Sequence, residues 1–194
     1  MRRRVGNSMT SRLVVDTIQA STLGGNMVTI PTGQKLYAPG HVIQVVQNFT
    51  NTQVSLATTT YTNTGLSASI NPSSANSKIL VIVNQSVRPG STGVAYAGGG
   101  VRLVRTSGAV DTTIVDSVAD GTGPYGVWWT GPTAGINYAT LHTINYLDSP
   151  GTVNTLTYRT QGRSYNSSVS YMNFNISDTG GSSGSTMLLL EIGG

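Results

Sequence analysis

The chain has 194 residues, no cysteine and 9% charged residues, where about a quarter is usual in a globular domain. This length suffices for one domain with an extension, and the lack of cysteine excludes disulfides and thiolate chemistry. The net charge of +4 is confined to the first twelve residues, because the rest of the chain balances seven basic against seven acidic groups.

The composition predicts an all-β protein. The chain holds 27 Thr, 22 Ser, 14 Asn and 24 Gly but only two Lys and one Glu. Thr suits pleated surfaces, whereas Gly, Asn and Ser suit turns. No apolar run approaches the roughly 18 residues that cross a bilayer, and no apolar signal-peptide core follows the basic start. We therefore expect a soluble protein without a membrane partner, not exported by the usual route.

Residues 1–39 are predicted to form an extended basic N-terminal arm that attaches the protein to its partners. LVVDTI and MVTI are short β-like segments between turns, each too short to bury its own face. Such a segment has too little apolar surface to offset its chain entropy, so it should become ordered only on another surface. The residues expected to make the attachment are Arg2, Arg3, Arg4, Arg12, Leu13, Val15 and Ile18.

Residues 40–194 are predicted to be the body, a two-sheet jelly-roll-like sandwich of about eight to ten strands. KILVIV (78–83) is apolar, β-branched and bounded by Asn and Ser, which predicts a strand buried on both faces by a second sheet or a neighbouring subunit. It and TMLLLEI (186–192) should take inner positions. Asn63–Gly65 is interpreted as a turn and residues 88–100 as a glycine-rich connection. Further strands are expected at 41–47, 54–62, 66–70, 101–105, 110–118, 125–129, 137–147, 153–160 and 169–176.

The sequence offers little that could catalyse a reaction. A catalytic triad needs a histidine, and both His41 and His142 are interpreted as ordinary strand residues. Asp111, Asp116 and Asp120 could bind calcium but lack the dense ligand spacing of a known loop. Asp148 and Asp178 are interpreted as turn caps, since Asp favours such positions. We expect no enzyme activity, cofactor or metal.

Two features could contact a partner. Trp128 and Trp129 are adjacent, so on a strand one ring faces the core while the other is free to meet a loop, a subunit or, with Tyr125, a glycan. Arg2–Arg4 could contact nucleic-acid phosphates, but no interleaved aromatic residues support base stacking, so nucleic acid is an unlikely partner. An acidic protein surface fits the arm at least as well.

Several stretches resemble structural proteins of tailed bacteriophages. SRLVVDTI, VTIPTGQKL and APGHVIQVVQ are similar to their N-terminal regions, and TTTYTNTGLSASINPSSANSKILVIVNQSV, VRLVR, NYLDSPGTVNTLTYRTQ and TMLLLEIGG resemble a β domain of phage fibre and virion-surface proteins. The resemblance covers most of residues 11–194 and assigns no functional residue. It implies a virion component made in the host cytoplasm, a homotrimer bound to capsid or tail proteins.

The sequence therefore favours a non-enzymatic virion structural protein. The arm would dock on the particle, and the body would project as a capsid decoration (cement) protein or a short fibre. The alternative is a tail-fibre receptor-binding protein that recognises a host surface glycan through Tyr125, Trp128 and Trp129. Capsid and tail locations both remain open at this stage.

Overall fold

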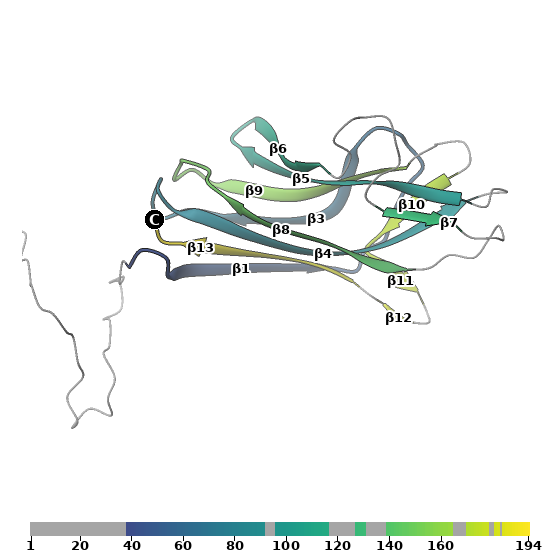
Figure 1. Cartoon of the computed structure of the whole chain (residues 1–194), viewed down its shortest axis with the longest axis horizontal. Coiled ribbons are helices and arrows are strands. Elements are labelled where there is room, and N and C mark those ends of the chain that lie inside the picture. The colour runs from purple at the N-terminus through teal and green to yellow at the C-terminus, as the bar shows by residue number, and fades with distance from the viewer. Residues whose placement is uncertain are drawn as a thin grey trace, which may run out of the picture. The chain divides into compact units, whose positions relative to one another are not determined.

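The computed structural model describes residues 38–91, 96–116, 127–130, 139–164, 170–178, 181–182 and 184–194. These residues form thirteen strands and no helix, which confirms the all-β prediction (Figure 1). No helix in this part of the chain could therefore span a membrane. The strands are β1 (Val42–Thr50), β2 (Val54–Leu56), β3 (Thr62–Ile70), β4 (Lys78–Ser91), β5 (Tyr96–Ser107), β6 (Val110–Asp116), β7 (Val127–Thr130), β8 (Thr140–Asp148), β9 (Leu156–Ser164), β10 (Ser170–Phe174), β11 (Ser177–Asp178), β12 (Gly181–Ser182) and β13 (Ser185–Ile192).

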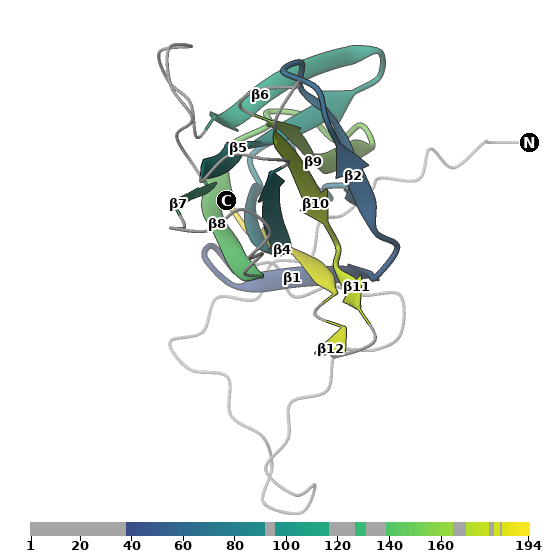
Figure 2. The same ribbon diagram turned by 90° about the vertical axis from the view of Figure 1, so that its right-hand side faces the viewer.

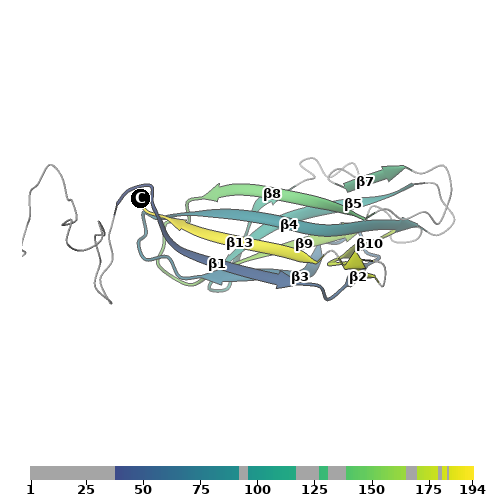
Figure 3. The same cartoon turned by 90° about the horizontal axis from the view of Figure 1, so that it is seen from below.

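Eight of these strands form a jelly roll, as predicted. Four antiparallel pairs are nested along the chain: β5 with β6, β4 with β8, β3 with β9, and β1 with β13. Additional pairing of β13 with β4 and of β9 with β5 rolls this nested ladder into two sheets. Their strand orders are β1–β13–β4–β8, here called the β4 sheet, and β3–β9–β5–β6, here called the β5 sheet. Figure 2 shows β5, β6 and β9 in one layer and β1, β4 and β8 in the other, and Figure 3 shows β8, β4, β13 and β1 in sheet order. Two packed sheets with this nested order are the jelly-roll arrangement.

The other five strands are short additions to this frame. β10 follows β13 along the same edge of β4, and β2 pairs with β10. β7 pairs with the start of β5, on the edge that β6 occupies further along. β11 and β12 form a separate two-stranded ladder.

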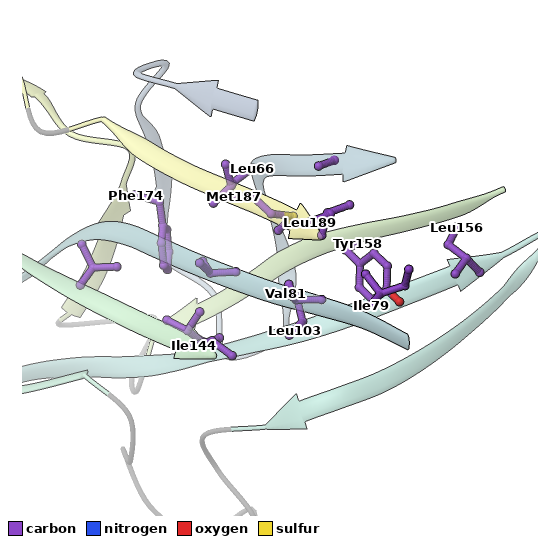
Figure 4. Close-up of a cluster of buried hydrophobic side chains, with 14 of the residues drawn as sticks. Leu66, Ile79, Val81, Leu103, Ile144, Leu156, Tyr158, Phe174, Met187 and Leu189 are labelled. Carbon is purple, nitrogen blue, oxygen red and sulfur yellow. The ribbon is translucent and has the colours of Figure 1, made fainter. Parts of the chain in front are cut away.

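The core lies between the two sheets, where alternate side chains of each strand point inward (Figure 4). Ile79, Val81 and Val83 of β4 are fully buried, as are Met187 and Leu189 of β13. They face a layer from the β5 sheet that includes Leu66, Leu103, Leu156 and Tyr158. The predicted inner positions of residues 78–83 and 186–192 are therefore confirmed. The prediction that KILVIV is buried on both faces is wrong for this chain alone, because Leu80 and Ile82 on the outer face are only half-buried.

Two predicted loops are strands. Asn63–Gly65, interpreted as a turn, lies within β3, where Gly65 has a φ of +87° and the register with β9 shifts. Residues 88–100, interpreted as a connection, extend β4 to Ser91 and contain the start of β5 at Tyr96. A side chain at Gly99 would overlap the Arg163 carbonyl oxygen and Met172, so glycine here permits close strand packing.

Candidate interaction surface

The outer face of the β4 sheet carries a continuous apolar row. Val45 of β1 pairs with Leu190 of β13, Leu190 with Leu80 of β4, and Leu80 with Leu147 of β8. Side chains directly opposite one another in paired strands share a face. The row therefore crosses the whole width of the sheet on its outer side. With their apolar neighbours on the same face, these residues make up the apolar band: Val42, Val45, Leu80, Ile82, Leu147, Leu188, Leu190 and Ile192.

The apolar band is exposed at both edges of the sheet. Val45 is 56% exposed, Leu147 49% and Val42 44%, whereas the residues on the two central strands are half-buried by their neighbours. Scattered single hydrophobic residues are normal on a protein surface. A band that is continuous across four strands is typical of an interaction site.

The surroundings of the apolar band hold almost no charge. The next positions along the strands carry amides and hydroxyls on Gln47, Asn84, Thr143, Asn145 and Thr186, together with Phe49, which pairs with Thr186 and is 56% exposed. Among the described residues in register on this face, the charged ones are Lys78, which pairs with Ile192, and Arg88, which pairs with Asn173, at opposite ends of β4. An apolar centre, a polar rim and few charges are features of protein–protein interfaces.

The outer face of the β5 sheet is different, because its polar side chains bind one another. The Arg102 guanidinium lies 4.3 Å from the centre of the Tyr61 ring, and its Nε donates to Gln161 Oε1 at 2.8 Å. The Tyr61 hydroxyl donates to Asp116 Oδ1 at 2.7 Å. Burial, followed by this hydrogen bond, raises the pKa of Tyr61 to about 12. This face is suited to solvent.

The calcium hypothesis gains no support from the acidic residues that the structure describes. Asp111 forms an ion pair with Arg159, and Asp116 accepts from Tyr61. A hydrogen bond from Thr106, followed by the charge of Arg159, lowers the pKa of Asp111. Asp120 lies outside the described residues. Within the described ranges, no group of three His, Asp or Glu side chains could hold a metal.

Two carboxylates are structural and lie inside the sandwich. Asp148 was interpreted as a turn cap, but it is the last residue of β8, is 6% exposed and pairs with Arg105. The turn-cap interpretation is wrong, because the inward alternation of β8 directs Asp148 toward β5 rather than into the following loop. Glu191 is fully buried and accepts from Gln44 Nε2 at 2.6 Å and from Ser73 N at 2.7 Å.

A shallow groove lies between β6 and β8, the strands that edge the two sheets on one side. It has a volume of about 590 Å³ and is lined by Ile114, Val115, Asp116, His142, Thr143, Ile144, Asn145 and Tyr146. Burial lowers the pKa of His142 and so favours its neutral imidazole. Tyr146 is 40% exposed. An aromatic ring beside hydrogen-bonding groups could receive a small polar ligand.

The structure describes only some of the residues that the sequence predicts to contact a partner. Arg2, Arg3, Arg4, Arg12, Leu13, Val15, Ile18 and Tyr125 lie outside the described residues. Trp128 and Trp129 are in β7, where their backbones pair with Gly98 and Ala97. Their side chains are outside the description. His41 is in the turn before β1, where its Nδ1 lies within hydrogen-bond distance of the Ala38 backbone.

The sequence carries a signal for the apolar band. The apolar runs of β4 and β13 have no polar alternation, which indicates two covered faces. The jelly roll covers one of them. The other face, with Leu80, Ile82, Leu188 and Leu190, is the centre of the apolar band.

No protein-family model matches the sequence, and no curated protein matches it. Among solved structures, the chain is similar to the structure of infectious bursal disease virus Gx strain, with 12% identity and a TM-score of 0.39 over 87% of this chain and 41% of that chain. It is also similar to the infectious bursal disease virus VP2 subviral particle, with 14% identity and a TM-score of 0.35 over 85% of this chain and 41% of that chain. The chain thus spans about two fifths of the length of the chains it matches. Similarity at this level carries no functional conclusion, and the fold assignment rests on the strand order.

Proposed function

We propose that this chain is a non-enzymatic structural protein of a tailed-bacteriophage particle. It forms a homotrimer, docks on capsid or tail proteins through residues 1–39, and projects the jelly roll as a decoration protein or short fibre. The observation that carries the proposal is the contrast between the outer faces of the two sheets. One face has its polar groups paired with each other, whereas the other presents the uncharged apolar band.

This contrast supports an assembly role. A protein that acts alone in solution gains nothing from an apolar band across a sheet, which exposes it to aggregation. A subunit of an oligomer buries such a band. The resemblance of the sequence to phage virion proteins supports the same role and supplies the kind of particle.

The state of the carboxylates supports a non-enzymatic role. General acid–base catalysis needs a carboxylate or histidine that can exchange a proton with a substrate. Asp111, Asp116, Asp148 and Glu191 are each bound by protein side chains. These interactions hold sheets and loops together, and they leave the four groups poorly suited to proton transfer.

The docking role of the arm is testable by deletion of residues 1–37. This deletion keeps the turn at Ala38–His41 and its hydrogen bonds, in which Gly40 N donates to Gly193 O at 2.7 Å and Gly193 N donates to His41 O at 2.9 Å. Because residues 38–194 contain the whole described core, the truncated chain should fold and form the same oligomer. We expect it to be missing from purified particles. Incorporation at the wild-type level would contradict the docking role.

A matched control separates the charge of the arm from its length. Replacing Arg2, Arg3 and Arg4 by alanine keeps the chain length and removes three of the four positive charges from the first twelve residues. If the arm docks on an acidic surface, incorporation of this variant should fall and its dependence on salt should weaken. Unchanged incorporation of this variant would assign docking to the apolar residues Leu13, Val15 and Ile18 instead.

The groove between β6 and β8 favours a second candidate function, recognition of a host surface glycan. Tyr146 supplies an exposed aromatic ring, and Asp116 and His142 supply hydrogen-bonding groups. β7, with Trp128 and Trp129, lies along the same edge of β5 as β6. Glycan-array binding that is lost in Tyr146→Ala and Trp129→Ala would support this function. No bound glycan and unchanged adsorption of particles carrying these variants would contradict it.

A further inference from the structure

We propose that the apolar band is the surface through which three copies of this chain meet, each presenting its β4 sheet to a common threefold axis. The inference rests on the homotrimer of the proposed function and adds which face forms it. The residues of the apolar band are defined by the strand register, which places Val45, Leu190, Leu80 and Leu147 side by side across the sheet.

The size of the face fits a subunit interface. Its outer strands β1 and β8 are nine residues long. Four strands about 4.8 Å apart and about 3.3 Å of length per residue give a projected area of roughly 570 Å². A standard interface buries ~800 Å² of accessible surface per partner. The accessible surface of this face is larger than its projected area, because side chains protrude from the sheet, so the two areas are of the same order. The apolar band lies within this area, and Gln47, Asn84 and Asn145 follow it on one side.

The charge pattern favours further copies of this chain as the occupant. Side chains close to a threefold axis meet their own counterparts from the other copies, so a charged residue near the axis meets like charges. The apolar band avoids this conflict, because the described charges on this face, Lys78 and Arg88, lie at the two ends of β4. The β5 sheet has Arg102, Arg159 and Asp111 on its outer face and could not meet itself in this way without desolvating them.

Two matched valines allow a direct test. Val45, within the apolar band, and Val153, in the loop between β8 and β9, are both 56% exposed. Lysine at either position should leave the isolated subunit folded, because both side chains already reach solvent. We expect sedimentation to give a trimer for the wild type and for Val153→Lys. The double variant Val45→Lys/Leu147→Lys should give one third of that mass with an unchanged β-type circular dichroism spectrum.

A labelling experiment reports on the same face without adding charge. The chain has no cysteine, so Val45→Cys and Val153→Cys each introduce a single thiol. We expect maleimide to label Val45→Cys roughly tenfold more slowly than Val153→Cys in the native protein, and at the same rate in urea. Equal native rates in a protein that sediments as a trimer would overturn the inference and leave the homotrimer standing.

Other occupants give different results. If the arm of the same chain covers the apolar band, deletion of residues 1–37 will speed the labelling of Val45→Cys while the mass per assembly stays at three chains, and the inference is overturned. If another protein covers it, the purified chain will label rapidly at both sites, which also overturns it. A monomeric wild type would instead contradict the homotrimer of the proposed function itself.

Discussion

The Arg105 guanidinium, in β5, donates from Nη1 to Oδ2 of Asp148 at 2.6 Å, at the end of β8, and so joins the two sheets of the jelly roll. The Tyr158 hydroxyl, from β9, donates to the same oxygen at 2.7 Å. Asp148 is 6% exposed and Tyr158 is fully buried. The carboxylate therefore binds two strands of the opposite sheet at once.

Replacing Asp148 by alanine should destabilise the protein strongly. The substitution leaves the Arg105 charge and the Tyr158 hydroxyl largely buried without their acceptor. Loss of one partner from a buried ion pair costs about 3–5 kcal/mol. The free energy of unfolding, measured in urea, should fall by that amount.

The exposed ion pair on the outer face of the β5 sheet provides the control. Asp111, whose side chain is 52% exposed, pairs with Arg159. Surface pairs contribute about 0–1 kcal/mol, so Asp111→Ala should have a small effect. Equal losses for the two alanine variants would show that Asp148 does not join the sheets as described.

Much of the fold could be predicted from composition and alternation. Thr-rich segments, turn residues at regular spacing and two continuous apolar runs indicated a two-sheet sandwich, and the runs at 78–83 and 186–192 do occupy inner strands. These features are local, so one sequence suffices to recognise them. Strand limits were less predictable, because Gly99 is accepted within β5 through close packing with Arg163 and Met172, and Gly65 takes a φ of +87° within β3, where the register shifts.

The contacts between distant polar residues could not be predicted. Gln85 Nε2 donates to Asn175 Oδ1 at 2.6 Å, and its Oε1 accepts from Thr160 at 2.6 Å. All three side chains are fully buried. Gln85 follows an apolar run, where the sequence suggests a strand end facing solvent. Only the nested pairing, which brings residues 75 and 90 positions apart together, makes the site a buried network.

The stability of the protein should fall in acid partly through Glu191. Burial alone would raise the pKa of this carboxyl, but hydrogen bonds from Ser73 and Gln44 outweigh it and lower the pKa below the usual 4.5. Because the folded-state pKa is the lower one, this contribution is present above pH 4.5 and is lost as the pH falls through the folded-state value.

Glu191→Gln should remove this part of the acid dependence. It also weakens hydrogen bonds to a charged acceptor, which contribute about 1.5–3 kcal/mol each. The free energy of unfolding, measured in urea at neutral pH, should therefore be lower for Glu191→Gln than for the wild type. This difference in free energy should become smaller as the pH falls below 4.5. A constant difference at all pH values would contradict the role of ionised Glu191.

Alkaline pH should unfold the protein through Tyr158. Burial, followed by the hydrogen bond to Asp148, raises the pKa of Tyr158 well above its usual value of 10.0. A raised folded-state pKa means that the contribution is complete below pH 10.0 and is lost as the pH rises toward the folded-state value. Tyr158→Phe should lower the free energy of unfolding in urea by about 0.5–1.5 kcal/mol at neutral pH. Above pH 10.0 the free energy of unfolding of this variant should decline less steeply than that of the wild type. An equally steep decline in this variant would assign the alkaline dependence to Tyr61, whose pKa is also raised.

Gly99→Ala should destabilise the protein through close backbone packing. The new methyl group would overlap the carbonyl oxygen of Arg163 in the paired strand β9, as well as the Met172 side chain. A side chain can rotate away, but the carbonyl is fixed in the sheet, so we expect a loss of about 3 kcal/mol or more in the free energy of unfolding. Gly108→Ala is the control, because a methyl group there meets no atom within 4 Å and only the φ of +60° opposes it. That conformation costs about 1–2 kcal/mol, so a loss at Gly99 no larger than at Gly108 would contradict the predicted overlap.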